Sequence, residues 1–413
     1  MEHSHPPILK ACILAIFISA TACGAYIGPA QGANAPVSLA PPLTSGKISG
    51  TEFGELEYVP IILEPTDFYL SLSKDLGNWK LSTVWSFEAM DPEEVSSILM
   101  SAGLGSEQAG HLTKPPFLTL NNSTKLFEIR PDEEAILNLS PGQRAKLYPL
   151  ILPKSPHNPF SEPFALGPGG VVGKNKIHSR VSPGLIEAID HMSFRQGHTV
   201  RFSDIRYILE KAQDDQERWN LMKIISREES LSVRLRVTNE SDVDSLVKFW
   251  SAGGRNKEIL PLLTSVISTP GVDTLDIVHL LPPTPRKHIH TFPSPRGEGL
   301  GDALPDCFWT AYSFFSENPP DRHLDGVAHV ESERYEAAAP PYQLGDVVTI
   351  SDDENKKTLH CCNILAGDLV FTKNGHSMGR PWSVTKLDRV IETYRRSDRI
   401  RVTFSRLKPE FQK

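Results

Sequence analysis

The small number of cysteines is the feature that most limits how this chain can fold. Beyond residue 23 only Cys307, Cys361 and Cys362 remain, and an odd number leaves at least one thiol free. Cys361 and Cys362 are adjacent, so on a strand their side chains would point to opposite faces and could not easily bridge each other. The sequence therefore argues against a disulfide scaffold. It also argues against a structural zinc site, because no C-x-x-C pair occurs.

The length and composition are those of a multidomain globular protein. The chain has 413 residues, of which 39% are hydrophobic and 23% are charged. This length suffices for two or three domains with substantial apolar cores. The formal net charge of -7 gives no reason to expect a nucleic-acid partner, and no sequence motif points to a cofactor or a metal ion.

The N-terminal segment predicts export. Lys10 is followed by the uncharged run ACILAIFISATA and then by Cys23, with Ala20 and Ala22 at cleavage-type positions. We interpret residues 1–23 as a signal peptide, which places the protein in the periplasm or cell envelope. The run is too short for the roughly 20 residues that cross a bilayer. Because ATAC resembles a lipobox, two interpretations of Cys23 remain: a lipid attachment site, or the residue after a plain cleavage site. Lipid attachment at Cys23 is the one membrane contact that we expect.

Composition and spacing divide the rest of the chain into an α+β, multidomain arrangement. Residues 24–50, rich in Ala, Gly, Pro and Ser, predict a flexible tether. Mixed helix and strand patterns predict an N-terminal α+β region over 51–155 and a middle α+β region over 183–280, with an irregular connection between them. A Pro-rich stretch over 281–299 predicts a linker, and its H-x-H pair lacks further metal ligands. The last domain is expected over 300–413.

The stretch DCFWTAYSFF predicts a short amphipathic helix over residues 306–315. Its apolar residues recur at helical spacing, and Asp306 precedes them as a candidate N-cap. Cys307 then occupies the first helical position, where unpaired N–H groups and the helix dipole favour a thiolate. A thiolate is the form of cysteine that acts as a nucleophile, although a buried structural cysteine is the alternative interpretation.

The segment LHCCNILAGDLVFTKNG predicts a β-hairpin over residues 359–375. A turn at 366–368 pairs 364 with 370, 362 with 372 and 360 with 374. His360 then shares a face with Thr372 and Asn374, while Cys361 and Cys362 are expected in the core. The alternatives are an ordinary turn at Asn374, or a base role for one of the loop histidines 323, 329 and 376. A helix over 385–395 and a strand over 399–408 complete the expected domain.

This order of elements resembles the NlpC-type cysteine peptidases and their CHAP relatives. The resemblance covers residues 300–413 and implies a papain-like domain in which a helix-borne Cys packs on a small antiparallel sheet. It implies that Cys307 is the nucleophile, that His360 is its base, and that Asn374, or its neighbour Thr372, orients the imidazole. The GD pair at 345–346 matches the family's turn before the first sheet strand, whereas the family usually has Pro where position 344 is Leu, and a small pair where 308–309 are Phe-Trp.

The resemblance implies an exported hydrolase that cleaves an amide bond in peptidoglycan or a related peptide without a cofactor. Two alternatives remain open at this point. The domain is either a non-catalytic envelope protein that kept the fold for binding or assembly, or a lipid acyltransferase that uses the same Cys-His pair. The bulky Phe308 and Trp309 suit an apolar acyl group as well as a narrow peptide cleft.

Overall fold

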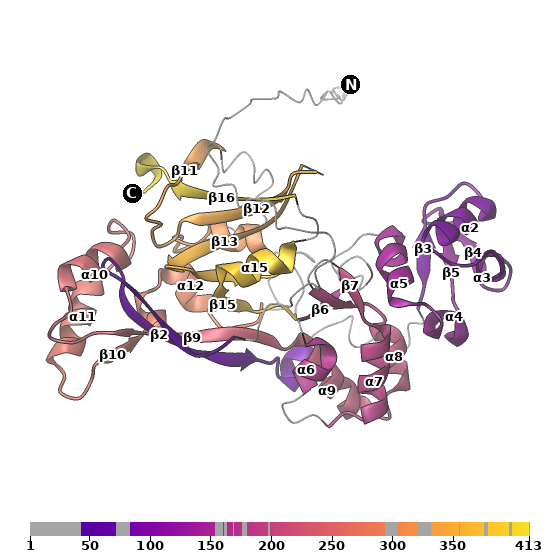
Figure 1. Ribbon diagram of the computed structural model, residues 1–413, viewed down its shortest axis with the longest axis horizontal. Helices are drawn as coiled ribbons and strands as arrows, with labels where there is room; N and C mark the ends of the chain where they lie inside the picture. Colours follow the sequence, from indigo (N-terminus) through magenta and orange to yellow (C-terminus); the bar gives the residue numbers. More distant parts are fainter. Residues whose placement is uncertain are drawn as a thin grey trace, which may run out of the picture.

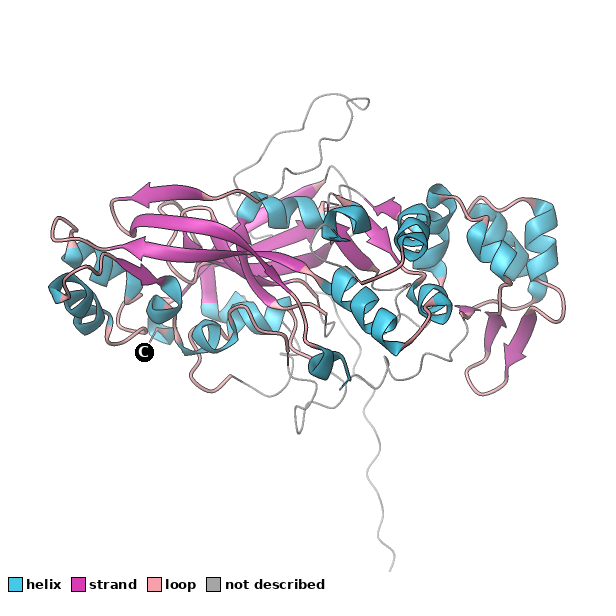
Figure 2. Ribbon diagram, turned by 90° about the horizontal axis from the view of Figure 1, so that it is seen from below, coloured by secondary structure: helices cyan, strands magenta, loops and turns pink. Residues whose placement is uncertain are grey.

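The computed structural model describes residues 43–71, 83–152, 160, 163–167, 169–175, 180–196, 199–293, 304–319, 332–354, 356–375, 379–395 and 399–412. The predicted signal peptide lies outside these ranges, as does most of the predicted tether. Within them the chain is mixed α+β, and neighbouring strands pair antiparallel in four sheets (Figures 1 and 2). None of the described helices has the length and apolar character needed to cross a bilayer.

One body of the molecule is built from residues between 67 and 226 around a shared apolar core. It contains two three-stranded sheets, ordered β3-β5-β4 and β6-β8-β7, surrounded by short helices (Figure 2). Its strands are β3 (Trp85–Phe87), β4 (Leu118–Asn121), β5 (Leu126–Ile129), β6 (Phe164–Gly167), β7 (Phe194–Gln196) and β8 (Thr199–Phe202). Its helices are α1 (Asp67–Ser71), α2 (Pro92–Ser101), α3 (Ser106–Leu112), α4 (Glu133–Leu137), α5 (Pro141–Leu147), η1 (Tyr148–Leu150), α6 (Gly170–Asn175), α7 (Pro183–Met192), α8 (Ile205–Lys211) and α9 (Asp215–Ser226).

The second body carries a four-stranded and a six-stranded sheet. The smaller sheet has the order β1-β2-β9-β10, from β1 (Gly46–Gly50), β2 (Gly54–Leu63), β9 (Glu228–Arg236) and β10 (Thr274–Asp276). The larger has the order β11-β16-β12-β13-β14-β15, from β11 (Tyr335–Ala337), β12 (Val347–Asp352), β13 (Lys357–Ala366), β14 (Leu369–Lys373), β15 (Trp382–Lys386) and β16 (Ile400–Leu407). The accompanying helices are α10 (Val243–Trp250), α11 (Ile259–Ser268), η2 (Ile277–Leu280), α12 (Pro283–His288), α13 (Cys307–Tyr312), α15 (Leu387–Tyr394) and η3 (Pro409–Phe411).

The apolar cores do not follow the domain boundaries that composition predicted. One core joins the predicted N-terminal region to the first part of the middle region, as far as residue 225. A second core joins residues 231–289 to the C-terminal domain, so the stretch 281–293 is packed structure and includes α12. The predicted linker over 281–299 is therefore wrong in this part, as is the tether at its end, where residues 46–50 form β1. Long-range strand pairing, which composition does not encode, causes both differences.

Ser230 of β9 links the two large sheets. Its hydroxyl accepts a hydrogen bond from the backbone N–H of Val384 in β15 at 2.9 Å and lies 3.2 Å from the carbonyl oxygen of the same residue. Both residues are buried. The smaller sheet is thus held against the strand that ends the six-stranded sheet.

Helices cover both faces of the six-stranded sheet. Along β13, Cys361 packs with Ala311 of α13 on one face. Cys362 packs with Val390 and Ile391 of α15 on the other face, as Figure 1 shows for α15 in front of the strands. The expected opposite orientation and core position of the paired cysteines are confirmed, and all three described cysteines are free.

Two features stabilise the Gly-Asp turn before β12: the backbone conformation of Gly345 and the hydrogen bonds of Asp346. Gly345 has φ +86°, and a Cβ at this position would lie 2.3 Å from the ring of Phe315, so no larger residue fits without rearrangement. The carboxylate of Asp346, which is buried, accepts two hydrogen bonds from the guanidinium of Arg406 in β16, at 2.8 and 2.6 Å. This bidentate pair ties the turn to the neighbouring strand.

Candidate active site

Cys307 begins α13, as the sequence predicts. The carboxylate of Asp306 caps the helix by accepting from the backbone N–H of Trp309 at 2.7 Å. The helix is shorter than the predicted 306–315, because it ends at Tyr312 and continues as a turn. Only 6% of Cys307 is exposed, and its sulfur accepts a hydrogen bond from the backbone N–H of Cys361. Burial, and after it the nearby Asp306 carboxylate, raises the pKa of the thiol to about 12, so it is protonated at neutral pH.

A buried lysine lies on the same side of the sheet as Cys307. The Nζ of Lys373 donates to the carbonyl oxygen of Gly375 at 2.6 Å and lies 5.7 Å from the ring centroid of Trp382. The Trp382 indole in turn donates to the hydroxyl of Thr310 in α13 at 2.9 Å. The positive charge of Lys373 lowers the pKa of Cys307, although burial outweighs it. We did not predict this residue, yet the strand alternation that placed Thr372 beside His360 puts Lys373 on the opposite face.

His360 lies fully buried on the face that α15 covers. Its ring stacks on that of Tyr394, with centroids 4.2 Å apart and planes 15° from parallel. Its Nε2 lies 2.8 Å from the hydroxyl oxygen of Thr372, whereas its Nδ1 is buried and has no hydrogen-bond partner among the described residues. Burial lowers the pKa of the imidazole to about 3, so the ring is neutral at physiological pH.

The predicted polar group beside His360 is present, with Thr372 as the direct partner. The hydroxyl of Thr372 donates to Oδ1 of Asn374 at 3.4 Å, so the three side chains form a continuous chain. The predicted pairing of 364 with 370 is confirmed. The turn is tighter than predicted, with a bulge between Ile364 and Ala366 that restores the register. Because β14 ends at Lys373, Asn374 reaches His360 through Thr372.

The structure does not bring the thiol and the imidazole into contact. Cys307 reaches β13 from the α13 face, and His360 points to the α15 face, because successive side chains on a strand alternate. The thiol nevertheless contacts the backbone of β13 at the residue that follows His360. The N–H that binds the Cys307 sulfur belongs to the peptide bond between His360 and Cys361. The predicted Cys-His hydrogen bond is thus absent between these two residues.

The other histidines that compete for the base role are not placed near Cys307 by the described structure. His323, His329 and His376 lie outside the described residues. In the predicted H-x-H pair, Nδ1 of His288 lies 2.8 Å from the carbonyl oxygen of Thr284, and His290 contacts the backbone of β9. The described ranges hold no group of three or more His, Cys, Asp or Glu side chains arranged for a metal ion.

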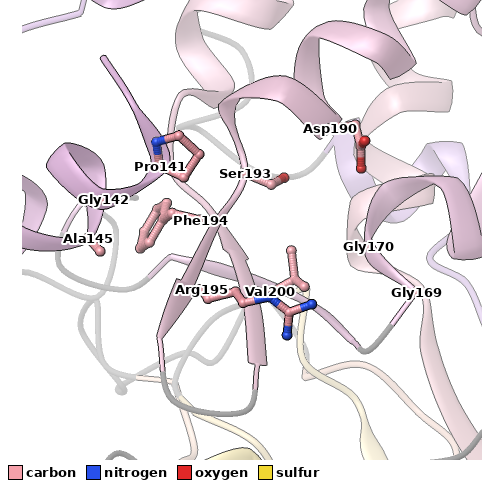
Figure 3. Close-up of a pocket in the computed structure, with 10 residues that line it drawn as sticks. All are labelled: Pro141, Gly142, Ala145, Gly169, Gly170, Asp190, Ser193, Phe194, Arg195 and Val200. Atoms are coloured by element: carbon pink, nitrogen blue, oxygen red, sulfur yellow. The ribbon is translucent and has the colours of Figure 1, made fainter. Parts of the chain in front are cut away.

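Two surface pockets are lined mainly by residues of the first body. One, of about 470 Å³, lies beside β7 and β8 and is shown in Figure 3. It is lined by Pro141, Gly142, Ala145, Gly169, Gly170, Asp190, Ser193, Phe194, Arg195 and Val200. The other, of about 350 Å³, is lined by Glu64, Asp67, Arg180, Gln216, Asn220, Lys223, Ile224 and Arg227. Neither pocket includes Cys307, His360, Thr372 or Asn374.

No family model, no curated protein and no solved structure matches the chain.

Proposed function

We propose that residues 300–413 form a papain-like, NlpC-type cysteine hydrolase domain of an exported envelope protein, which cleaves an amide bond in peptidoglycan or a related peptide. One observation carries the proposal. The Nε2 of His360 contacts Thr372 while its Nδ1 has no partner in the described part of the chain, and the Cys307 sulfur accepts from the peptide N–H next to that same histidine. An imidazole with one nitrogen held by an orienting group and the other free is the form that serves a thiol as general base.

The chemistry requires His360 to leave its stack on Tyr394 and reach the α13 face when substrate binds, which needs a local twist of β13 as well as a turn of the side chain. The Cys307 proton passes to Nδ1, and the sulfur attacks the carbonyl carbon of the scissile amide to give a tetrahedral adduct. The C–N bond then breaks as Nδ1 returns the proton to the leaving amine, which leaves a thioester. Water, losing a proton to Nδ1, attacks the thioester, and the acid product leaves as the sulfur recovers its proton.

The test is release of soluble fragments from purified peptidoglycan by the full chain, measured by mass spectrometry. We expect the wild-type protein to release fragments with newly exposed amine and carboxyl ends. Cys307→Ala should lose this activity by several orders of magnitude, since removal of a covalent nucleophile costs up to about 10⁶-fold in rate.

Cys362→Ala is the matched control, because this thiol packs in the apolar cluster under α15 and is expected to affect stability alone. The hydrolase proposal fails if the folded wild-type chain releases nothing from peptidoglycan or small peptide amides. Equal release by wild type and Cys307→Ala would also exclude it.

A second candidate is a non-catalytic envelope protein that uses this fold for binding or assembly. The burial of both groups favours it, since the thiol is held protonated and the imidazole neutral on separate faces of the sheet. This candidate predicts co-sedimentation of the chain with peptidoglycan, unchanged by Cys307→Ala and without release of fragments. Fragment release that depends on Cys307 would exclude it.

A further inference from the structure

A chain of polar contacts runs from His360 to a carboxylate on a different sheet. Beyond Thr372 and Asn374, the Nδ2 of Asn374 donates to Oε1 of Glu228 at 3.4 Å. The other oxygen of Glu228 accepts from the guanidinium of Arg380 at 3.0 Å, in a pair that is largely shielded from solvent. Glu228 is the first residue of β9, so a residue 132 positions before His360 in the sequence forms the far end of its polar support.

The chemistry of each group sets the direction of every hydrogen bond in this chain. An ionised carboxylate only accepts, so Glu228 must receive from the amide NH₂ of Asn374. The amide oxygen of Asn374 therefore points toward Thr372, and a carbonyl oxygen can accept a hydrogen bond but cannot donate one. The Thr372 hydroxyl therefore donates to Asn374, and its lone pairs are left to receive from His360. The nitrogen of His360 that donates is Nε2.

We propose that Glu228 is a positioning residue that, through Asn374 and Thr372, holds His360 as the Nε2–H tautomer with Nδ1 unprotonated and free. The buried, unpartnered Nδ1 is the independent observation that agrees with this assignment. Without the carboxylate, the Asn374 amide is free to rotate and present its NH₂ group to Thr372. The hydroxyl would then donate to Nε2, and the proton of the neutral ring would move to Nδ1.

The assignment couples the imidazole to the packing of β9 against the end of β14. Glu228 begins the strand that carries Ser230, whose hydroxyl bonds to Val384. A shift of β9 would move the Glu228 carboxylate away from Asn374, and the His360 ring would then no longer be held as the Nε2–H tautomer. The value of this control for catalysis rests on the proposed function, whereas the tautomer itself does not.

The test reads the two ring nitrogens of His360 directly. Long-range ¹H–¹⁵N correlation spectra of the ¹⁵N-labelled full chain distinguish a protonated from an unprotonated ring nitrogen, and His360→Gln identifies the signals. We expect a protonated Nε2 and an unprotonated Nδ1 between pH 5 and 8. In Glu228→Ala we expect loss of this pattern, with Nδ1 protonated in a large share of the molecules.

Two variants frame the result. Glu229→Ala removes a neighbouring carboxylate that pairs with Arg389 instead, so it is the matched control and should retain the wild-type pattern. If Glu228→Ala does not fold, Glu228→Met fills the same space without an acceptor and takes its place. A wild-type ring protonated at Nδ1, or a wild-type pattern in Glu228→Ala or its replacement Glu228→Met, would overturn the proposal. Because no turnover is measured, these outcomes are separate from failure of the hydrolase proposal.

Discussion

The two faces of the six-stranded sheet differ in the charges and hydrogen bonds that they place around Cys307 and His360. On the α13 face, Cys307 lies near the positive charge of Lys373 and accepts a backbone hydrogen bond, both of which favour its thiolate. On the α15 face, His360 lies against Tyr394, and burial lowers the pKa of its ring without a contribution from any charge among the residues that the structure describes. Both reactive groups are therefore neutral at pH 7, but only the α13 face also contains groups that would stabilise a charge on its reactive residue.

This difference indicates which group must move for the two to react. The charge of Lys373 and a backbone hydrogen bond favour the Cys307 thiolate, but burial and the Asp306 carboxylate outweigh them, and the helix start holds the thiol against β13. The imidazole has an orienting group on one nitrogen, while the other has no hydrogen-bond partner within the described ranges. Because the two groups lie on opposite faces of β13, rotation of the ring alone leaves them apart, and the pair can meet only if the strand around His360 also twists.

The largest expected effect is a pH-dependent loss of stability caused by His360. The pKa of the ring is about 6.5 in an unfolded chain and about 3 when folded, so the unfolded state binds the proton between these values. Stability is therefore fully present above pH 6.5 and falls as the pH drops toward 3. The cost is about 1.4 kcal/mol per pH unit, or about 5 kcal/mol over the whole window.

Urea unfolding from pH 7 to pH 4, compared between wild type and His360→Gln, measures this term. Carboxylates contribute equally to both proteins, so the difference between them isolates the imidazole. We expect the advantage of wild type to shrink as the pH falls. Parallel curves would mean that His360 is charged or exposed in the folded protein, and the contrast between the two faces would be lost.

The second expected effect concerns the reactivity of the Cys307 thiol. With its pKa raised from 9.0 to about 12, the thiolate fraction at pH 8 is about a thousand-fold below that of a free thiol. Iodoacetamide labelling followed by peptide mass spectrometry should therefore show slow modification of Cys307 without substrate. Labelling should accelerate as the pH rises toward 12.

Labelling of Cys307 at pH 6 faster than that of a free thiol would contradict this picture. It would mean that the thiol and the imidazole are already paired without substrate. Cys361 and Cys362, both fully buried, serve as internal controls for general unfolding of the protein.

Local patterns in the sequence predicted the elements of the C-terminal domain well. Short-range spacing predicted four features of this domain. They are the N-cap at Asp306, the pairing of 364 with 370, the helix that contains Val390 and the strand at 400–407. Each of these depends on residues within about ten positions of one another. The α+β class and the antiparallel sheet under the Cys307 helix are confirmed for the same reason.

The domain boundaries and the environment of the site were not predictable in this way. β2 pairs with β9 across more than 160 residues, and Glu228 reaches Asn374 from 146 positions away. No periodicity in the sequence encodes such contacts. The face of His360 was predicted correctly relative to Thr372, but the side from which α13 approaches depends on how the helix crosses the sheet, and no local pattern determines that.

The smallest expected effect comes from removing the hydrogen bond between His360 and Thr372 on the α15 face. Thr372→Val keeps the shape of the side chain but leaves the buried Nε2–H of His360 without an acceptor, which costs about 1–3 kcal/mol. Thr372→Ser, which keeps the hydroxyl, should cost less. The cause is separated by repeating Thr372→Val in a His360→Phe background, where no donor remains to be orphaned and the penalty in urea unfolding should fall toward zero. An equal penalty in both backgrounds would show that Thr372 stabilises the hairpin by packing alone, and the two faces would then differ in charge but not in hydrogen bonding.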